Sequence, residues 1–365
     1  MRPQLKGLSW ERDGERLRLV YDPRDQFLLS DPDGSVAKLL ALLSEGGRTI
    51  GELADVLSAD VAEVRAAVTA LDAHGLLEDG DRVGGLTAYE AERYCSNLAF
   101  FESFASLDRS RVDLQRRLRE SHVLVLGTGG LNSTVIQHLA GLGVGRVTLV
   151  DRDRVEPRNF ARQYLYRWAD LGDRKVSRAA EWVRAFDPAI EVETIDASID
   201  GPEQLVELVG RLRPDAVAVG VDQPDAVDLW VNQACVRHGV PYVRAGVLVT
   251  TGGVWSVDPG TSACRACIPA DPVDLTAYAD PDDSTRNAIS AMRLYLSRPR
   301  DNRGIGPALG LLGSYAAFEL LRYLTRLEPP AHAGRPLVLD FAGGCAANQP
   351  DEWQRNPDCT VCGGR

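Results

Sequence analysis

The sequence lacks both a long hydrophobic run and an excess of positive charge. No stretch approaches the ~18 apolar residues of a membrane span, and the opening residues MRPQLKGLSW contain no signal-peptide core. The formal net charge is −11, which argues against a protein that coats nucleic acid or another large anionic surface. We expect a cytoplasmic protein with neither a membrane nor a nucleic-acid partner.

Cysteine is scarce and unevenly placed. There are 7 in 365 residues, and four of them form two Cys-x-x-Cys pairs, Cys264 with Cys267 and Cys359 with Cys362. Because no export signal accompanies them, the pairs indicate a metal site and not disulfides. Four thiolates suit a closed, structural zinc site that would pin the C-terminal tail to the Cys264 segment. A redox pair is the alternative.

The N-terminal residues 1–85 predict a small separate module. The alternation of residues 16–21 and 27–29 predicts a hairpin, and helical spacing follows over residues 36–43, 50–57 and 61–71. Thr49 and Ser58 are the expected N-caps of the second and third helices. Residues 76–83 are expected to form a β-wing.

This set of elements resembles the winged helix-turn-helix of the PqqD type, which recognises peptides for enzymes that modify ribosomal peptides. The alternatives are DNA binding and a structural or dimerising appendage. Acidic residues outnumber Lys plus Arg by 16 to 10 over residues 1–85, the wrong sign for gripping phosphates. We therefore expect the module to bind a precursor peptide, with the leader added as a strand along the hairpin edge.

A βαβ unit with a glycine turn follows a helical linker, residues 86–120, that begins after Gly84-Gly85. The apolar run 123–126 predicts a buried parallel strand, and it leads into Gly127, Gly129 and Gly130 before a helix over residues 131–142. A second apolar run, 147–150, ends in Asp151. Such glycines let backbone N–H groups approach a phosphate, and the acid can accept hydrogen bonds from ribose hydroxyls. The alternative is a tight turn needed only for packing.

Strand and helix patterns then alternate to about residue 257, which predicts a doubly wound, Rossmann-like α/β sheet across a domain of residues 121–365. Residues 269–303 lose this periodicity and become rich in Asp, Pro and Arg. A connection of that length inside a compact domain is usually functional. A small-residue-rich helix is expected over residues 304–327, and a strand over 337–341.

The ordered motifs of this domain resemble those of the ThiF/MoeB family, the adenylating enzymes related to ubiquitin activators. They are the glycine turn, Asp151, Lys175, Asp222, the two cysteine pairs and the run Asn159-Phe160-Ala161-Arg162-Gln163. The stretch VDQPDAVDLWVNQACVRHGVPYVRAGV and the N-terminal module are most similar to the type that matures microcin C peptides.

The resemblance implies an ATP-dependent adenylyltransferase and a role for each motif. Arg162 and Lys175 would hold the phosphates, Asn159 and Gln163 would support the triphosphate, and Asp222 would bind Mg²⁺. Three positions depart from the family pattern. Asn132 replaces the last glycine of the turn, Gln223 replaces the asparagine after the magnesium aspartate, and Ser96 occupies the place of an arginine that reaches into a partner's site, with Arg93 nearby.

The resulting hypothesis is an enzyme that activates a peptide carboxylate as its acyl-adenylate, with residues 269–303 clamping the substrate end. A ubiquitin-like sulfur carrier is an alternative substrate, and a non-catalytic leader-binding subunit is an alternative class. A dinucleotide dehydrogenase would account for the glycines but not for Arg162, Lys175 or the cysteines. The resemblance also implies a homodimer.

Overall fold

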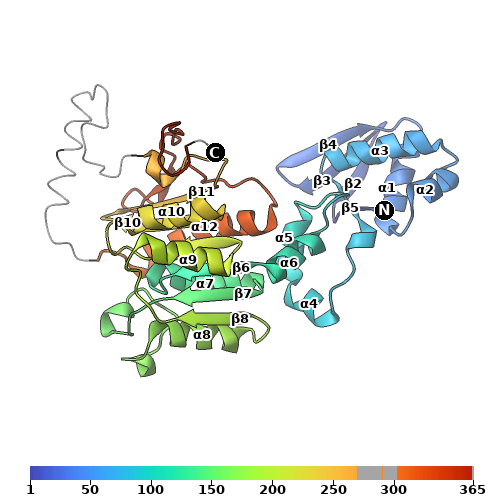
Figure 1. Ribbon diagram of the computed structural model, residues 1–365. Coiled ribbons are helices and arrows are strands. Elements are labelled where there is room, and N and C mark those ends of the chain that lie inside the picture. Colours follow the sequence, from blue (N-terminus) through green and yellow to red (C-terminus); the bar gives the residue numbers. More distant parts are fainter. Residues whose placement is uncertain (269–289, 291–301, 364–365) are drawn as a thin grey trace. The chain divides into compact units, whose positions relative to one another are not determined.

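The computed structural model describes residues 1–268, 290 and 302–363. They fall into two compact units, residues Met1–Leu118 and Arg119–Arg365 (Figure 1). The predicted clamp, residues 269–303, lies outside the described part except for residues 290, 302 and 303. Within the described residues no helix is long and apolar enough to cross a membrane.

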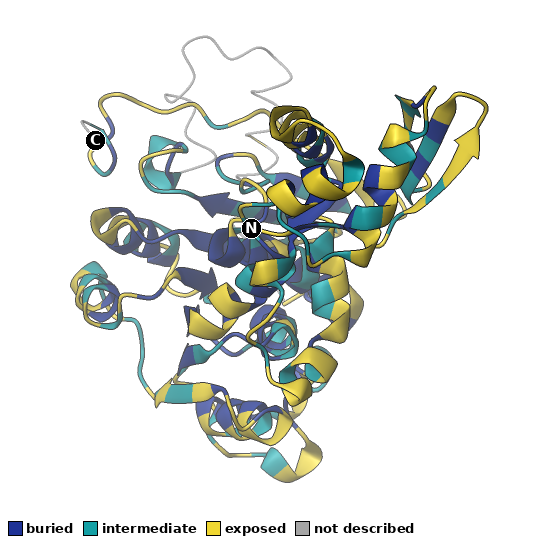
Figure 2. Ribbon diagram, turned by 90° about the vertical axis from the view of Figure 1, so that its right-hand side faces the viewer, coloured by how far each residue is buried: buried dark blue, intermediate teal, exposed yellow. Residues whose placement is uncertain are grey.

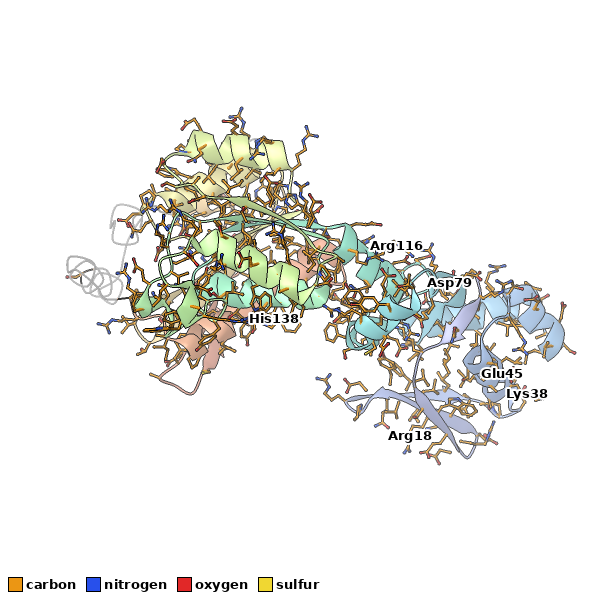
Figure 3. All side chains as sticks on the ribbon, turned by 90° about the horizontal axis from the view of Figure 1, so that it is seen from below. Arg18, Lys38, Glu45, Asp79, Arg116 and His138 are labelled. Atoms are coloured by element: carbon orange, nitrogen blue, oxygen red, sulfur yellow. The ribbon has the colours of Figure 1, made fainter. Side chains whose placement is uncertain are left out.

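The first unit combines two small sheets with six helices. Its elements are β1 (Pro3–Leu5), β2 (Ser9–Asp13), β3 (Arg16–Asp22), β4 (Asp25–Ser30), α1 (Ser35–Glu45), α2 (Ile50–Leu57), α3 (Val61–Ala73), β5 (Leu77–Asp79), η1 (Gly80–Arg82), α4 (Ala88–Arg93), α5 (Cys95–Glu102) and α6 (Arg111–Glu120). Strands β2, β3 and β4 form an antiparallel sheet in that order, with Arg18 on the central strand (Figure 3), and β1 pairs with β5.

The predicted hairpin and the three helices that follow it are confirmed, and so is one of the two caps. The Thr49 hydroxyl accepts the N–H of Glu52, and the Glu52 carboxylate accepts the N–H of Thr49. The Ser58 cap is wrong: Ser58 ends α2 with φ 53, and Asp60 caps α3 instead. Residues 76–83 do not make a wing of their own. Only Leu77–Asp79 is extended, and the Asp79 side chain accepts the Asp81 N–H, which starts a 3₁₀ turn.

The helices after residue 85 are tied to this unit by charged groups that reach its core. Arg111 of α6 pairs with Glu78 of β5, which is fully buried, and with Glu102 of α5 at 2.8 Å. The Lys6 ammonium, also buried, donates to the Ala105 carbonyl at 2.7 Å. Burial raises the pKa of Glu78 although Arg111 attracts the charged form. The pair with Arg111 is therefore what keeps a carboxylate tolerable in this core.

The second unit is built around one eight-stranded sheet. Its elements are β6 (His122–Leu126), α7 (Gly130–Leu142), β7 (Arg146–Val150), η2 (Pro157–Asn159), η3 (Trp168–Asp170), α8 (Lys175–Phe186), β8 (Glu191–Ile195), α9 (Pro202–Leu212), β9 (Ala216–Val219), α10 (Val227–His238), β10 (Tyr242–Leu248), β11 (Thr251–Val257), η4 (Arg265–Cys267), α12 (Gly306–Thr325), β12 (Leu337–Asp340) and β13 (Ala346–Asn348).

The strand order is β13-β12-β11-β10-β9-β6-β7-β8. Neighbouring strands pair in parallel from β10 through β9, β6 and β7 to β8, whereas β10 with β11, β11 with β12 and β12 with β13 pair antiparallel. The predicted Rossmann-like sheet is thus confirmed, as a mixed sheet. Helix α7 packs with α12 and α8, and α9 packs with α10. The central strands are buried on both faces (Figure 2). The chain runs outward from β6 to β8 and then returns to β9 on the other side of β6, so ligands are expected where the ends of β6 and β9 part.

Replacing Arg111 by leucine should destabilise the first unit by about 3 kcal/mol, because the buried Glu78 carboxylate loses its cation. Arg18→Leu is the matched control, since Arg18 pairs only with the exposed Glu11 and Asp13 in the described residues and should cost less than about 1 kcal/mol. Urea unfolding, monitored through hydrogen exchange in β1 and β5, measures the change in the free energy of unfolding for both variants. Equal small losses would contradict the role given to Arg111.

Candidate functional site

The glycine turn after β6 lies against the end of β9. Gly127 has φ +82, and a Cβ built on it would lie 3.0 Å from Val221 Cγ1 and 3.3 Å from the Gly220 carbonyl oxygen. A side chain is therefore disfavoured both by backbone conformation and by space. This close approach brings the predicted glycine turn beside the segment that leads to Asp222.

Helix α7 begins at Gly130, and its N-terminus is open. Its N-cap, Gly129, provides no side-chain hydrogen bond, so among the described residues no capping side chain accepts from the first N–H groups of this 13-residue helix. A Cβ on Gly130 would lie 2.5 Å from Leu309 Cδ1 and 3.1 Å from Arg162 Cγ. The glycine thus lets the stem of Arg162 pack on the helix start, beside N–H groups suited to an anion.

Asn132, the departure from the family pattern, stabilises the turn. Its side-chain amide is buried and donates to the carbonyls of Leu126 at 3.0 Å and Gly127 at 2.7 Å. Its Cγ and Nδ2 also lie within 3 Å of the position that a Cβ on Gly220 would take. The asparagine therefore fills the space between the two strand ends and leaves the helix start intact.

Asp151 ends β7 and is held by hydrogen bonds. Its Oδ2 accepts the Thr128 N–H at 2.7 Å and the Thr128 hydroxyl at 2.9 Å, and its Oδ1 accepts the Asp153 N–H at 2.8 Å. The buried Tyr166 hydroxyl donates to the Thr128 carbonyl at 2.7 Å, and burial raises the pKa of Tyr166. The carboxylate keeps acceptor capacity on Oδ1 for a further donor.

A cleft of about 340 Å³ opens beside Asp151. It is lined by residues at or after three strand ends: Val150, Asp151 and Arg152 at the end of β7, Ala197, Ser198, Ile199 and Asp200 after β8, and Val221, Gln223 and Pro224 after β9. A second cavity, of about 210 Å³, shares four of these residues and continues toward α9. The volume is within the usual range for a small-molecule site.

The predicted phosphate-binding run forms a turn that faces the glycines. The Asn159 side-chain oxygen accepts the Glu156 N–H at 2.8 Å, and the Asn159 backbone carbonyl accepts the N–H groups of Arg162 and Gln163. Gln163 is 4% exposed, and its Nε2 lies 3.8 Å from where a Cβ on Gly129 would be. Its Oε1 has no hydrogen-bond partner in the described part of the chain, so this amide has unused bonding capacity beside the turn.

Arg162 is half-buried and donates to the Arg158 carbonyl at 3.1 Å. Over the residues that the structure describes, it forms no ion pair with an acidic side chain. Its stem lies at the start of α7.

Lys175 opens α8, as predicted, but it is buried and paired. Its ammonium donates to Asp153 Oδ2 at 2.8 Å, and its backbone N–H donates to the Asp153 carbonyl at 3.0 Å. Two ammonium protons remain for another acceptor. Asp153, which the sequence reasoning missed, thus links Lys175 to the strand end that carries Asp151.

Asp222 is exposed and follows β9. It stands two residues beyond Gly220, which touches the glycine turn, and between Val221 and Gln223, which both line the cleft. The Gln223-Pro224 peptide is cis. The predicted residues therefore gather at one edge of the sheet. Arg162 and Gln163 lie at the glycine turn, Lys175 is bound to Asp153 after β7, and Asp222 follows the end of β9.

Thr128, Asp153, Tyr166 and Leu309 belong to the same region but were not predicted. The D-x-D spacing of Asp151 and Asp153 was the one local pattern that could have identified any of them. Arg93, the substitute for the absent arginine, stacks over the Tyr94 ring at 5.0 Å; no feature of the structure tests a role for it in a partner's site.

The four cysteines of the two pairs form a cluster. Their sulfur atoms all lie within 4.8 Å of one another, with Cys264 and Cys359 3.7 Å apart and Cys267 and Cys362 3.3 Å apart. Tetrahedral Zn–S bonds of about 2.3 Å would place sulfurs at about these separations. Burial raises the pKa of Cys264, so a cation that binds the thiolates would offset that cost.

Asn232 of α10 supports the cluster from behind. It is fully buried, its Nδ2 donates to Cys264 Sγ at 3.5 Å, and its Oδ1 accepts from the Arg265 N–H at 2.8 Å and the Tyr242 hydroxyl at 3.1 Å. Such bonds orient a thiolate ligand. They also connect the cluster to the helix that follows Asp222.

Comparison with known proteins agrees with this geometry. The ThiF family profile matches residues 97–361. The chain is 33% identical over 251 residues to adenylyltransferase and sulfurtransferase MOCS3 of Sus scrofa, which covers 69% of this chain and 50% of that protein. It is 29% identical over 260 residues to the sulfur carrier protein ThiS adenylyltransferase of Escherichia coli K12, covering 71% and 92%. The chain thus spans about half the length of MOCS3 and most of the ThiS enzyme.

Solved structures show the same fold. Escherichia coli MccB superposes with a TM-score of 0.77 at 20% identity, covering 100% of this chain and 98% of that one. MccB with ATP gives a TM-score of 0.74 at 19% identity, covering 100% of both chains. Because the family profile spans most of the chain, including every predicted site residue except Cys362, the chain belongs to the ThiF family.

Proposed function

We propose that the protein adenylates the C-terminal or side-chain carboxylate of a ribosomally made precursor peptide, in the biosynthesis of a modified peptide natural product. The observation that carries the proposal is Arg162, an arginine without an acidic partner among the described residues, packed on the open N-terminus of α7 beside the Asp151 cleft. A cation and a helix N-terminus without a capping side chain in the described part of the chain, next to a cleft of small-molecule size, suit a nucleoside triphosphate.

The reaction joins two anions, so charge neutralisation is its main requirement. A carboxylate oxygen of the peptide attacks the α-phosphorus of ATP, and the bond from that phosphorus to the β-phosphate oxygen breaks to release pyrophosphate. Arg162 and Lys175 would hold the phosphates, Asn159 and Gln163 would donate hydrogen bonds to them, and Asp151 would bind the ribose. Asp222 is an exposed carboxylate, a ligand type that suits Mg²⁺, and the ion would supply further neutralising charge when bound.

The first unit would hold the precursor, as a PqqD-like peptide-recognition module. Strand β4 is an edge of its three-stranded sheet and carries Leu28, which is 52% exposed. An extended peptide could pair with that edge and cover Leu28. Solved structures of MccB include complexes with MccA, among them its N-formylated form. Residues 269–303 would hold the reacting end, and a homodimer is expected from the resemblance.

A sulfur-carrier protein is the second candidate substrate, because the relatives at 29% to 33% identity include a sulfur carrier adenylyltransferase. A non-catalytic leader-binding subunit is the third possibility. We propose zinc for the Cys264, Cys267, Cys359 and Cys362 cluster. Four protein ligands leave no open coordination position, so this zinc would be structural.

The substrate class can be tested by ATP–pyrophosphate exchange. We expect exchange with short peptides that have a free C-terminal or side-chain carboxylate, and none with the same peptides when those carboxylates are amidated. A ubiquitin-like carrier ending in Gly-Gly is the comparison. Exchange with the carrier alone would replace the peptide proposal by the second candidate, and ATP-independent peptide binding without exchange would favour the third.

Asp222→Ala should lower peptide-dependent exchange at least about 100-fold, because the Mg²⁺ that would balance the charge on the triphosphate loses its carboxylate ligand. The melting temperature should not change, since the side chain is exposed. Asp225→Ala, three residues on and also exposed, is the control and should keep full activity. Retained exchange in Asp222→Ala would remove this residue from the site.

Metal analysis of the purified protein should find about one zinc per chain. Cys359→Ser should lose it and melt at a lower temperature, because the tail is no longer tied to the Cys264 segment. Cys345→Ser is the control, since Cys345 is exposed and lies outside the cluster. A wild-type protein without zinc, or with Cys264 and Cys359 joined as a disulfide, would contradict the assignment.

A further inference from the structure

We infer that Tyr166 and Thr128 are positioning residues that fix the Asp151 carboxylate for recognition of the nucleotide ribose. The inference rests on the proposed ATP site and adds two residues to it. Neither residue lines the cleft, so both would act through Asp151.

The three residues form one chain of hydrogen bonds, which runs from two buried residues to the half-buried Asp151. Tyr166 is 5% exposed and Thr128 is fully buried. The Tyr166 Oη lies 2.7 Å from the Thr128 carbonyl oxygen and 2.8 Å from Thr128 Oγ1, and Thr128 Oγ1 lies 2.9 Å from Asp151 Oδ2. The Thr128 N–H adds a second bond to the same Oδ2, at 2.7 Å.

The direction of these bonds follows from the carboxylate. An ionised carboxylate only accepts, so the Thr128 hydroxyl proton must point to Asp151. Tyr166 must then donate its own proton to Thr128, at the carbonyl, at Oγ1 or shared between them. The tyrosine hydroxyl thus orients the threonine hydroxyl, and the threonine in turn orients the carboxylate.

The same chain connects the two ends of the proposed nucleotide site. Tyr166 follows Arg162 by four residues and Gln163 by three, and its N–H donates to the Gln163 carbonyl at 3.4 Å. Through Thr128, its hydroxyl therefore connects the segment of Arg162 and Gln163 to Asp151. If the Asp151 carboxylate could rotate freely, it would not be held in the orientation that accepts a hydrogen bond from the ribose.

Asp151 has one acceptor position left for a ligand. Oδ2 carries two bonds from Thr128, and Oδ1 carries one from the Asp153 N–H. Because Asp151 lines the cleft, a ribose hydroxyl can donate to Oδ1. Loss of the Tyr166 or Thr128 hydroxyl should therefore weaken binding of a nucleotide that has this ribose hydroxyl. It should have little effect on an analogue that lacks the hydroxyl.

The test is calorimetric binding of ATP, 2′-deoxy-ATP and 3′-deoxy-ATP to the full-length protein with Mg²⁺. The wild type should bind ATP at least about tenfold more tightly than one of the deoxy analogues. Tyr166→Phe and Thr128→Val should each reduce that ratio about fivefold. Thr128→Ser retains the hydroxyl and should keep the ratio. Tyr323→Phe, which removes another buried hydroxyl, bonded to Ser256 at 2.9 Å, should keep it too.

An unchanged ratio in both Tyr166→Phe and Thr128→Val would overturn the inference, even if these variants melt earlier, because the network would then be structural only. If Tyr166→Phe does not fold, the comparison of Thr128→Val with Thr128→Ser decides. Equal affinity of the wild type for all three nucleotides would also overturn it. Absence of ATP binding by the wild type would instead overturn the proposed function.

Discussion

The close contact between the glycine turn and the end of β9 is the constraint on which the candidate site depends. Gly127 adopts φ +82 with the Gly220 carbonyl oxygen 3.3 Å from its Cβ position, so the two strand ends meet without a side chain between them. That contact places the start of α7 next to Val221, which lines the cleft, and Asp222 stands only two residues beyond Gly220. The stem of Arg162 can then pack on Gly130, at a helix start whose N–H groups favour an anion.

Much of this could be predicted because its determinants are local. Buried parallel strands are short apolar runs, a turn at positive φ needs glycine, and Lys175 stands at the start of an amphipathic helix. The bond between Thr128 and Tyr166 spans 38 residues, and polar pairs of that kind leave no periodic pattern. The pairing of β5 with β1 was missed for a similar reason: both strands have three residues, too few for alternation to indicate a partner. Ser58 and Asp60 are both good cap residues by type, so only the geometry of the α2–α3 connection distinguishes them.

The cysteine cluster also joins parts of the domain that are distant in sequence. Its members come from two segments about 95 residues apart, which the chain brings together with Cys264 against Cys359. Asn232 holds Cys264 from α10, the helix that begins five residues after Asp222. A structural ion there would therefore stabilise the helix that follows the proposed magnesium ligand, as well as the tail. In the first unit, the Arg111–Glu78 pair has an analogous role, because it ties late helices to a buried strand.

The central claim is that this edge of the sheet makes a carboxylate reactive by joining it to the α-phosphate of ATP. Transfer of ¹⁸O tests it most directly. A peptide whose carboxylates carry ¹⁸O is incubated with the enzyme and ATP, and the AMP released on hydrolysis of the product is examined by ³¹P NMR. Attack by the carboxylate predicts AMP that contains one ¹⁸O from the peptide. Unlabelled AMP, or ADP in place of AMP and pyrophosphate, would contradict the account.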